Sequence, residues 1–260
     1  MNPYENLQDK RLRPRLLKAE QKICLARLLD LAGDYLRDGY TYSRKSYTFT
    51  DDSQEAPLAE AAPDQAALLS RADSLEALKV EIQHCQGCPL HTGRIHAVPG
   101  EGASQPLVLV IGEGPGADED ASGRPFVGKA GQLLDRMLEA VDLSRERNCF
   151  IANVVKCRPP NNRDPLPEEI AACAPFLDRQ LALLKPRMIL CVGRVAMQSL
   201  LHTDEGIGRL RGKLTVYKGF SLLGTYHPSA LLRDASLKRA AWEDLKILRD
   251  HLTALDKQEP

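Results

Sequence analysis

Residues 107–116 read Leu-Val-Leu-Val-Ile-Gly-Glu-Gly-Pro-Gly, an unbroken apolar run that ends at Gly112 and passes into a glycine-rich loop. An apolar run without alternation is typical of a strand buried on both faces of a sheet. The same signature recurs at 149–155, 188–192 and 221–226. Helical spacing of apolar residues lies between or after these runs, at 130–141, 167–185, 194–202 and 237–252. The alternation predicts an α/β fold with a mostly parallel sheet covered by helices on both faces.

Polar motifs follow three of the predicted strands. They begin after Ile111, after Val155 and after Tyr226. Ligands of open parallel sheets bind at the carboxyl ends of the strands, where these loops emerge. We therefore expect the three motifs to contribute to one site.

The part of the chain before these strands has a different character. Residues 10–38 show helical spacing of leucines, and residues 50–66 combine prolines and acidic residues with too little apolar bulk to pack, as in a linker. Ser74 opens a short helix that runs into a cysteine pair. We expect a helical N-terminal extension over residues 1–70 and one folded domain over residues 71–260.

Composition bounds the class of protein. The 260 residues are 43% hydrophobic and 27% charged, with zero formal net charge, as in an ordinary globular protein. No apolar run approaches the roughly 18 residues of a membrane helix, and Met1–Lys10 is polar, so we expect a cytoplasmic protein without a membrane partner. Zero net charge argues against nucleic-acid binding, but basic residues gather at 10–27 and 205–239, apart from the acidic stretch 51–81. A local cationic face is therefore expected.

Four of the seven cysteines have a spacing typical of a metal site. Cys85 and Cys88 form a C-x₂-C turn, and Cys157 and Cys173 form a C-x₁₅-C pair. Four thiolates complete either an iron-sulfur cluster or a structural zinc site. Structural zinc more often uses two tight knuckles, so the wide second spacing favours iron-sulfur. Apolar neighbours flank the remaining cysteines, which we expect to be buried thiols: Cys24, Cys149 and Cys191.

The loop after the first strand matches the dinucleotide fingerprint G-x-G-x-x-A over Gly112–Ala117, but its context does not. Pro115 restricts the turn, no helix is expected directly after it, and no acidic residue ends a second strand at the required distance. Acidic residues and Phe126 follow instead. Such a loop suits a pocket for a flat polar ring, with carboxylates near a centre that becomes cationic.

Two more side chains stand at strand ends. Asn153 can both donate and accept hydrogen bonds, as the recognition of a nucleobase edge requires. His227 opens the motif His-Pro-Ser after the strand at 221–226. A lone Asn is more often a turn former and a lone His a structural residue, but their shared placement at one sheet edge favours a functional role.

The assembled motifs resemble the iron-sulfur uracil-DNA glycosylases, known as family 4. Five stretches carry the resemblance, together with the cysteine spacing: Gly112-Glu-Gly-Pro-Gly, Gly123-Arg-Pro-Phe-Val-Gly-Lys-Ala-Gly-Gln-Leu-Leu, Asn153-Val-Val-Lys-Cys-Arg-Pro-Pro-Asn-Asn-Arg, Gly208-Arg-Leu-Arg-Gly-Lys and His227-Pro-Ser-Ala. The resemblance spans residues 85–233 and implies a three-layer αβα fold. It implies an enzyme that flips uracil out of DNA and hydrolyses its N-glycosidic bond in base excision repair. It also implies a 4Fe-4S cluster held by Cys85, Cys88, Cys157 and Cys173.

The resemblance further implies roles for individual residues. Phe126 would stack on the flipped uracil, Asn153 would bind its pairing edge, and Glu119 would occupy the space of a thymine methyl group. His227 would stabilise the charge that builds on uracil O2 as the bond breaks. Glu113 and the Gly114 backbone would face the sugar and the attacking water, with Glu113 either activating that water or only stabilising the cation.

DNA contacts are expected from two further segments. Leu231 and Leu232 offer a wedge for the gap left by the flipped base, although they could equally be core residues. Cationic side chains would contact phosphates, namely Arg209, Arg211, Lys213 and Arg233. Family members usually have an acidic residue where this chain has Ala117, a departure of small expected consequence because Asp118, Glu119 and Asp120 follow.

Three alternatives compete with this interpretation. The covalent uracil-binding branch of the superfamily has a His-bearing insertion after the second strand, whereas residues 158–169 contain no His. A non-catalytic DNA-replication accessory protein would not need Glu113, Asn153 and His227 together. A nucleotide-dependent oxidoreductase would need the fingerprint context rejected above. We expect a monomer that acts on uracil-containing DNA, with an extension able to contact repair or replication proteins.

Overall fold

A computed structural model describes residues 74–257 of the chain. The chain divides into two units, Met1–Asp64 and Gln65–Pro260, and the described residues belong to the second. The predicted N-terminal helix and the predicted linker lie outside the described residues. Within residues 74–257, no helix has the length and apolar character needed to cross a membrane.

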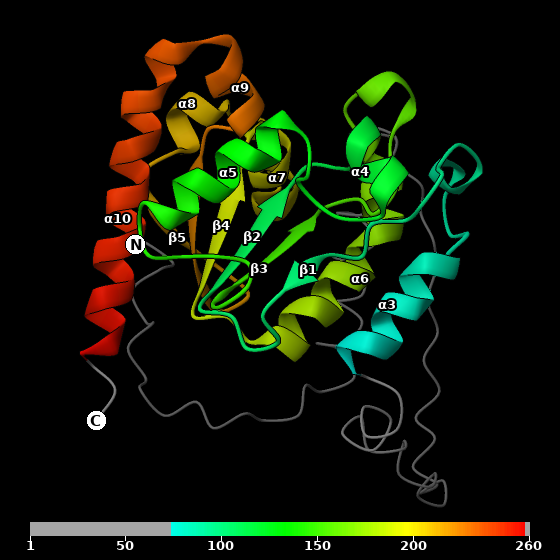
Figure 1. Cartoon of the computed structure of the whole chain (residues 1–260), viewed down its shortest axis with the longest axis horizontal. Helices are drawn as coiled ribbons and strands as arrows, with labels where there is room; N and C mark the ends of the chain where they lie inside the picture. Colours follow the sequence, from blue (N-terminus) through cyan, green and yellow to red (C-terminus); the bar gives the residue numbers. More distant parts are fainter. Residues whose placement is uncertain (1–73, 258–260) are drawn as a thin grey trace, which may run out of the picture. The chain divides into compact units, whose positions relative to one another are not determined.

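A six-stranded sheet in the order β1-β3-β2-β4-β6-β5 forms the centre of the described unit (Figure 1). The four inner strands are parallel to one another. They are β2 (Val108–Gly112), β3 (Cys149–Asn153), β4 (Met188–Val192) and β6 (Phe220–Thr225). The edge strands β1 (Glu101–Gly102) and β5 (Leu214–Tyr217) pair antiparallel.

Helices cover both faces of the sheet, so the predicted αβα layering is confirmed. Alternate residues of β2 enter different apolar cores: Leu109 and Ile111 face one, Val108 and Val110 the other. The first core is completed by α3 (Leu75–His84), α6 (Pro167–Leu184) and α7 (Arg194–Leu201). The second is completed by α5 (Lys129–Glu139) and α10 (Lys238–Asp256). The inner strands β2, β3 and β4 are therefore buried throughout, which is why their sequences do not alternate.

Short elements that lack apolar periodicity were not predicted. They include the edge strands β1 and β5 and the helices α4 (Ala117–Ser122), α8 (Ile207–Leu210) and α9 (Pro228–Arg233). The predicted strand at 149–155 ends at Asn153, because the chain turns there toward Cys157. Ser74 is the N-cap of α3, as its sequence position predicted, and its hydroxyl accepts a hydrogen bond from the Ala77 amide at 3.0 Å.

The strand register brings the polar motifs together at one edge. Gly112 at the end of β2 is paired with Asn153 at the end of β3, and Val192 at the end of β4 is paired with Thr225 at the end of β6. The loops after these strands therefore leave the sheet side by side. This arrangement confirms the expectation that the motifs contribute to one site.

Candidate active site

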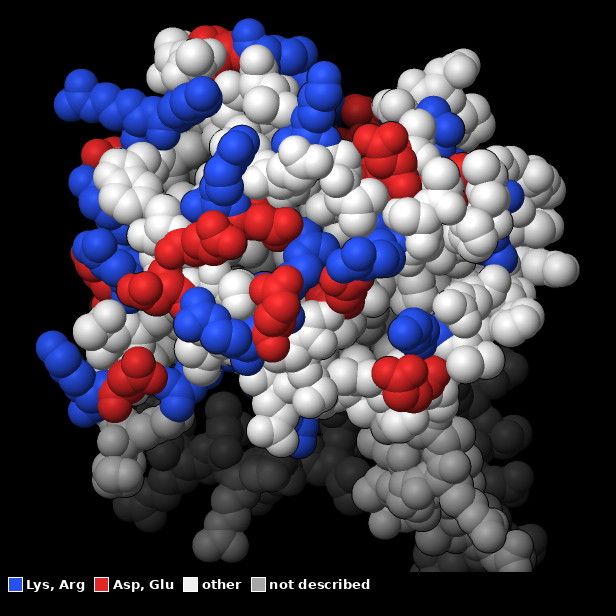
Figure 2. Space-filling view, in the orientation of Figure 1, with Lys and Arg blue, Asp and Glu red and all other residues white. Residues whose placement is uncertain are grey.

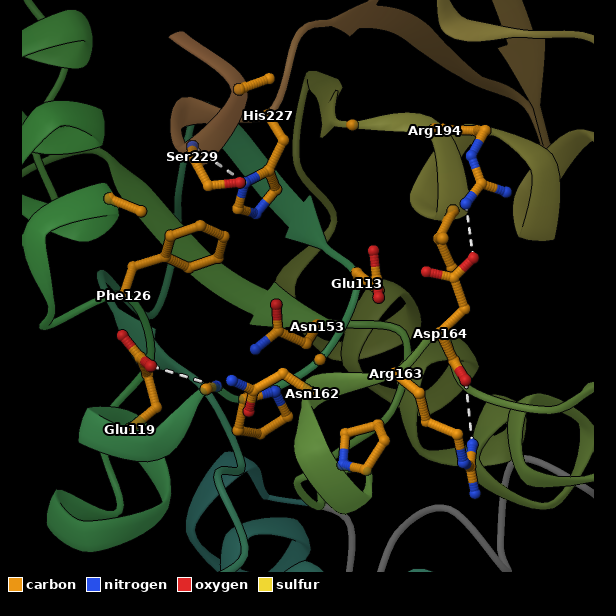
Figure 3. A pocket seen from close by; sticks show the side chains of 18 of the residues that line it. Glu113, Glu119, Phe126, Asn153, Asn162, Arg163, Asp164, Arg194, His227 and Ser229 are labelled. Carbon is orange, nitrogen blue, oxygen red and sulfur yellow. Dashed lines mark hydrogen bonds and ion pairs between the residues drawn. The ribbon is translucent and has the colours of Figure 1, made fainter. Parts of the chain in front are cut away.

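A cavity of about 540 Å³ lies where the loops leave the strand ends. We call it the strand-end cavity. The residues that line it include six that are expected in the site from the sequence: Glu113, Gly114, Glu119, Phe126, Asn153 and His227. Figure 3 shows Phe126, Asn153 and His227 on one side of the cavity. Asp164 and Arg194 form a pair on the other side, and Glu113 lies between the two groups.

Asn153 presents an unsatisfied polar atom to this cavity. The residue is 1% exposed, and its Oδ1 is the one buried side-chain nitrogen or oxygen atom without a hydrogen-bond partner in the described part of the chain. A buried carbonyl oxygen without a partner costs about 1–3 kcal/mol, so native proteins rarely retain one without a reason. The amide is therefore ready to accept a hydrogen bond from a ligand.

Gly112 allows the two groups at the floor of the cavity to approach each other. A Cβ atom at this position would lie 2.5 Å from Asn153 Oδ1 and 2.5 Å from Cζ of Phe126. Both contacts are far inside van der Waals distance, so any side chain here would displace the amide or the ring. The glycine that ends the first predicted strand thus sets the spacing between an aromatic ring and an amide.

Phe126 is held in a conformation that its own backbone does not favour. Its φ of 52° lies in the left-handed region, which is uncommon for a bulky residue. The buried guanidinium of Arg145 donates hydrogen bonds to the carbonyls of Pro125 and Phe126, at 2.9 and 3.0 Å. Gly131 lies so close that a Cβ there would be 1.9 Å from the Phe126 carbonyl oxygen. Surrounding contacts therefore fix the ring, as expected where strain is maintained at a functional position.

Glu119 is anchored by backbone amides on both sides of its loop. One carboxylate oxygen accepts hydrogen bonds from the amides of Val127 and Gly128 at 2.9 and 3.1 Å. The other accepts from Gly116 at 3.1 Å. These three bonds leave the carboxylate little freedom to move. Glu119 is therefore a rigid wall of the cavity beside Phe126 (Figure 3).

The hydrogen bonds of His227 identify its tautomer. Its Nδ1 accepts a hydrogen bond from the Ser229 backbone amide at 3.1 Å, and the Ser229 hydroxyl lies 2.8 Å from the same atom. A backbone amide can only donate, so Nδ1 carries no proton and the proton of a neutral ring is on Nε2. The ring lies 5.7 Å from that of Phe126, centroid to centroid. His227 thus offers a single N–H donor.

Burial keeps His227 neutral. Desolvation lowers the pKa of His227 to about 4, the cation of Arg233 acts in the same direction, and Glu119 acts against them. The imidazole is therefore uncharged at neutral pH. The neutral imidazole does not attract anions to the site. It can still donate a hydrogen bond to a ligand oxygen that gains negative charge.

Glu113 has an unusual carboxyl environment. Its pKa is raised to about 7, chiefly by burial and also by charge repulsion and a hydrogen bond from the Asp164 carboxyl, while Arg194 acts in the opposite direction. Asp164 forms an ion pair with Arg194, and both side chains are about half exposed at the cavity rim (Figure 3). Glu113 therefore changes its charge near neutral pH.

Arg211, expected among the phosphate contacts, has an internal partner instead. Its guanidinium donates to both carboxylate oxygens of the buried Asp244, at 2.9 and 2.6 Å, and lies over the ring of Tyr226. Thr225 also donates to Asp244, at 2.7 Å. This pairing holds the guanidinium against an internal carboxylate. Arg211 instead fixes α10 to the end of β6, immediately before His227.

The wedge prediction is corrected in one detail. Leu231 is 2% exposed and packs into the protein, whereas its neighbour Leu232 is 48% exposed. A residue that fills the gap left by a flipped base must be exposed, so Leu232 and not Leu231 fits that role. Arg209, Lys213 and Arg233 are exposed, and Arg233 also lines the strand-end cavity.

Charges of both signs share the surface. On the face drawn in Figure 2, Lys and Arg side chains are interspersed with Asp and Glu, and no large patch of one sign covers it. Arg233 is an exposed cation that lines the strand-end cavity.

The four spaced cysteines line a second, smaller cavity, which we call the cysteine cavity: Cys85, Cys88, Cys157 and Cys173. Hydrogen bonds reach three of the sulfur atoms: Gly87 N donates to Cys85 Sγ at 3.3 Å, Arg94 Nη1 to Cys157 Sγ at 3.0 Å and Lys156 N to Cys173 Sγ at 3.3 Å. Donors directed at sulfur are typical of thiolate ligands. Cys149 and Cys191 are buried in β3 and β4, as expected, and Cys24 lies outside the described residues.

Within residues 74–257, no three His, Cys, Asp or Glu side chains are arranged to hold a single ion. The donor set of the cysteine cavity is four thiols. Four thiols are a donor set that fits an iron-sulfur cluster.

One reason for rejecting the dinucleotide fingerprint was wrong. A helix does open directly after the glycines: α4 begins at Ala117 with Gly116 as its N-cap. Its first turn contains Asp118, Glu119 and Asp120, which would repel a phosphate at the helix N-terminus. The acidic turn and the Glu119 contacts still disfavour dinucleotide binding.

Sequence reasoning missed several residues of the site. Arg194 directly follows β4 and Gly193, so the rule that placed Asn153 and His227 at strand ends could have found it. Asp164 and Arg145 belong to loops whose paths depend on tertiary contacts, and no local signal marks them. Their positions emerge only with the fold.

Comparisons with known proteins agree with this geometry. The family model of the uracil DNA glycosylase superfamily matches residues 99–246. The type-4 uracil-DNA glycosylase of Sulfurisphaera tokodaii is 43% identical over 187 residues, 68% of this chain and 84% of the relative. That of Pyrobaculum aerophilum is 45% identical over 183 residues, 66% of this chain and 92% of the relative.

A more distant match concerns one of the alternatives. The DNA polymerase of Bacillus phage SP01 is 26% identical over 149 residues, which are 57% of this chain and only 16% of the polymerase. The type-4 relatives match at higher identity and over most of their own length. The chain belongs to the type-4 uracil-DNA glycosylases of the uracil DNA glycosylase superfamily.

Proposed function

We propose that this protein removes uracil from DNA by hydrolysing its N-glycosidic bond, which leaves an abasic site. The observation that carries the proposal is Asn153 Oδ1, a buried acceptor without a partner at the floor of the strand-end cavity. Uracil has a donor at N3 and an acceptor at O4. The Asn153 amide complements both, since Oδ1 accepts and Nδ2 donates. Cytosine would meet this amide with the opposite pattern at both atoms.

Two rigid groups support the selection of uracil. Phe126, fixed by Arg145 and Gly131, would stack on the flipped base. Extrusion of a base costs a few kcal/mol, and stacking in the cavity offsets part of that cost. Glu119, anchored by three backbone amides, would stand where a thymine carries its methyl group. A wall that cannot move excludes thymine by steric overlap.

His227 would stabilise the leaving group. Cleavage of the glycosidic bond separates an oxocarbenium-like sugar from a uracil anion. The neutral ring donates from Nε2, because Nδ1 accepts from Ser229. A positioned donor that strengthens its hydrogen bond as charge develops stabilises the transition state more than the ground state.

Glu113 and the backbone of Gly114 would face the sugar. An ionised Glu113 stabilises the cationic sugar and can orient the attacking water. Its pKa of about 7, raised by burial and by Asp164, divides the population between the two protonation states near neutral pH. The charge of Glu113, and with it the excision rate, should therefore depend on pH in this range.

DNA would approach over the rim of the strand-end cavity. Exposed Leu232 is the proposed wedge, and Arg209, Lys213 and Arg233 are the proposed phosphate contacts. We infer that the enzyme acts as a monomer in the cytoplasm and that residues 1–70 form an extension able to contact repair or replication proteins. Residues 71–260 would form the catalytic domain.

A 4Fe-4S cluster is the proposed cofactor, with Cys85, Cys88, Cys157 and Cys173 as ligands. The cysteine cavity supports it through its donor set and the hydrogen bonds to sulfur. When bound, the cluster would supply a structural crosslink between α3, the turn after β3 and α6. Protein purified without oxygen should be brown and contain about four iron atoms per chain. Stoichiometric zinc without visible absorbance would contradict this assignment.

Release of free uracil from a labelled oligonucleotide tests the activity directly. We expect uracil as the released product and an abasic site in the DNA, with several turnovers per enzyme molecule. A protein–DNA adduct that survives denaturation would indicate the covalent branch of the superfamily. Binding without release would indicate an accessory protein. Either of these results would overturn the proposal.

A further inference from the structure

Lys156 is a buried cation between the two cavities. The residue is 1% exposed, and its Nζ donates hydrogen bonds to the main-chain oxygen of Asn153 and to Oε1 of Gln180, each at 2.7 Å. Gln180 is itself fixed, because its Nε2 donates to the Pro99 carbonyl at 2.6 Å. The ammonium therefore contacts the backbone of the residue whose side chain forms the floor of the strand-end cavity.

The other end of Lys156 belongs to the cysteine cavity. Its backbone amide donates to Cys173 Sγ at 3.3 Å, and the residue lines the cavity beside the four cysteines. Helix α6 carries both Cys173 and Gln180, and both are buried. One lysine thus joins a cysteine of the helix, a glutamine of the same helix and the end of β3.

The charge of Lys156 lacks the usual compensation. Within residues 74–257, both hydrogen-bond acceptors of its ammonium are neutral groups, the main-chain carbonyl of Asn153 and the side-chain amide of Gln180. A buried ammonium without an anion is costly, so its presence calls for negative charge nearby. Four thiolates that bind a cluster would supply that charge.

We propose that Lys156 is a positioning residue that couples the cysteine cavity to uracil recognition: it compensates the charge of the ligated thiolates and fixes the backbone of Asn153. The first half concerns the cysteine cavity alone, and the second rests on the proposed function. Loss of the lysine should leave the Asn153 side chain present but less well oriented. It should also make the cluster harder to reduce, because reduction adds negative charge that the ammonium no longer offsets.

Three substitutions by Met separate the charge effect from the positioning effect. Met has a volume similar to that of Lys or Gln but carries no charge. Lys156→Met removes the charge and the hydrogen bond to Asn153. Gln180→Met retains the cation and removes one of its acceptors. Lys218→Met is the matched control. Lys218 is an exposed lysine whose ammonium pairs with Asp178 of helix α6 at 2.5 Å.

The variants are compared by iron content, cluster reduction potential and single-turnover uracil excision. In Lys156→Met we expect a more negative potential and excision slowed about tenfold, with unchanged binding of abasic DNA. In Gln180→Met we expect slower excision by about threefold with the parent potential. Lys218→Met should match the parent in every measurement.

Each result decides one part of the proposal. A parent-like potential in Lys156→Met would overturn the charge role, and parent-like excision in that variant would overturn the positioning role. If Lys156→Met loses its iron while Lys218→Met retains it, the loss supports the charge role, and excision by Gln180→Met tests positioning alone. If the parent protein releases no uracil, the proposed function fails, but the potential of Lys156→Met still tests the link to the cysteine cavity.

Discussion

The strand-end cavity and the cysteine cavity lie on either side of the turn Asn153–Cys157. They differ in whether their acceptor atoms have hydrogen-bond partners within the protein. In the strand-end cavity Asn153 Oδ1 is buried without a partner. In the cysteine cavity three of the four sulfur atoms already accept hydrogen bonds from the protein. The first arrangement suits a ligand that comes and goes. The second suits a group that stays, because the protein supports its ligands permanently.

The difference separates catalysis from architecture. Two groups that line the strand-end cavity, Glu113 and His227, have pKa values shifted to about 7 and about 4. Perturbed pKa values in a cavity are typical of catalytic groups. Substitutions in the strand-end cavity should therefore change the chemistry while the cysteine cavity keeps its iron.

His227→Ala should have the largest effect on the rate. Removal of the Nε2–H donor takes away stabilisation of the uracil anion, so single-turnover excision should slow by about 10²-fold or more. Affinity for uracil-containing DNA and iron content should change much less. A variant that cleaves at the parent rate would refute the leaving-group role. Parallel loss of iron would show that the two cavities are not separable.

The two adjacent leucines of α9 should respond differently. Leu231→Ala removes buried volume and should destabilise the protein by about 2–5 kcal/mol in thermal or chemical unfolding. Leu232→Ala should leave stability nearly unchanged and slow excision from duplex DNA by up to about tenfold, with less effect on single strands. If Leu232→Ala slowed excision equally on duplex and single-stranded DNA, the assignment of Leu232 as a wedge would be wrong.

The pH dependence of excision should report Glu113. In its proposed role the carboxylate is the active form, and its pKa lies near 7, so kcat/KM should fall as the pH drops below about 7. Asp164→Asn removes a neighbouring charge and a hydrogen bond that raise this pKa, so the acidic limb should move to lower pH. His227 has a pKa of about 4 and cannot produce that limb. An unmoved limb in Asp164→Asn would mean that another group titrates.

Deletion of residues 1–70 should have the smallest effect. If those residues form a separate extension, the shortened protein should keep its iron and most of its activity on short duplexes. The measurement is uracil excision by the deletion variant and the full chain on the same oligonucleotide. A shortened protein that holds iron but is inactive would place part of the extension in the site.

The inner sheet could be predicted because burial on both faces leaves a local signal. The strand at 188–192 was placed without error, and β2 and β6 were shifted by one residue. The edge strand β5 escaped notice because its exposed Leu214 and Val216 alternate with half-buried residues over only four positions. Helix α4 escaped because its sequence has no apolar periodicity, and the contacts of Glu119 stabilise it instead.

Site residues at the ends of strands could be predicted. Site residues whose positions depend on partners distant in sequence could not. Asn153 and His227 follow from the rule that parallel strands direct their carboxyl ends to one edge. The internal partner of Arg211 could not be predicted, because Asp244 is distant in sequence. The sequence also could not distinguish the orientations of Leu231 and Leu232 in a short helix. Lys156 looked like any lysine near a cysteine until its burial was known.

We propose that the side-chain amide of Asn153 recognises uracil, with the unpartnered Oδ1 as acceptor and Nδ2 as donor. Asn153→Asp tests this recognition, because it replaces the donor with a second acceptor. A carboxylate accepts where the amide donated, so the match to uracil weakens and the edge pattern tilts toward cytosine. Single-turnover kinetics on duplexes that contain uracil or cytosine should show slower uracil excision and a smaller preference for uracil over cytosine. An unaltered preference for uracil in Asn153→Asp would contradict the assignment of Asn153 as the residue that reads the base.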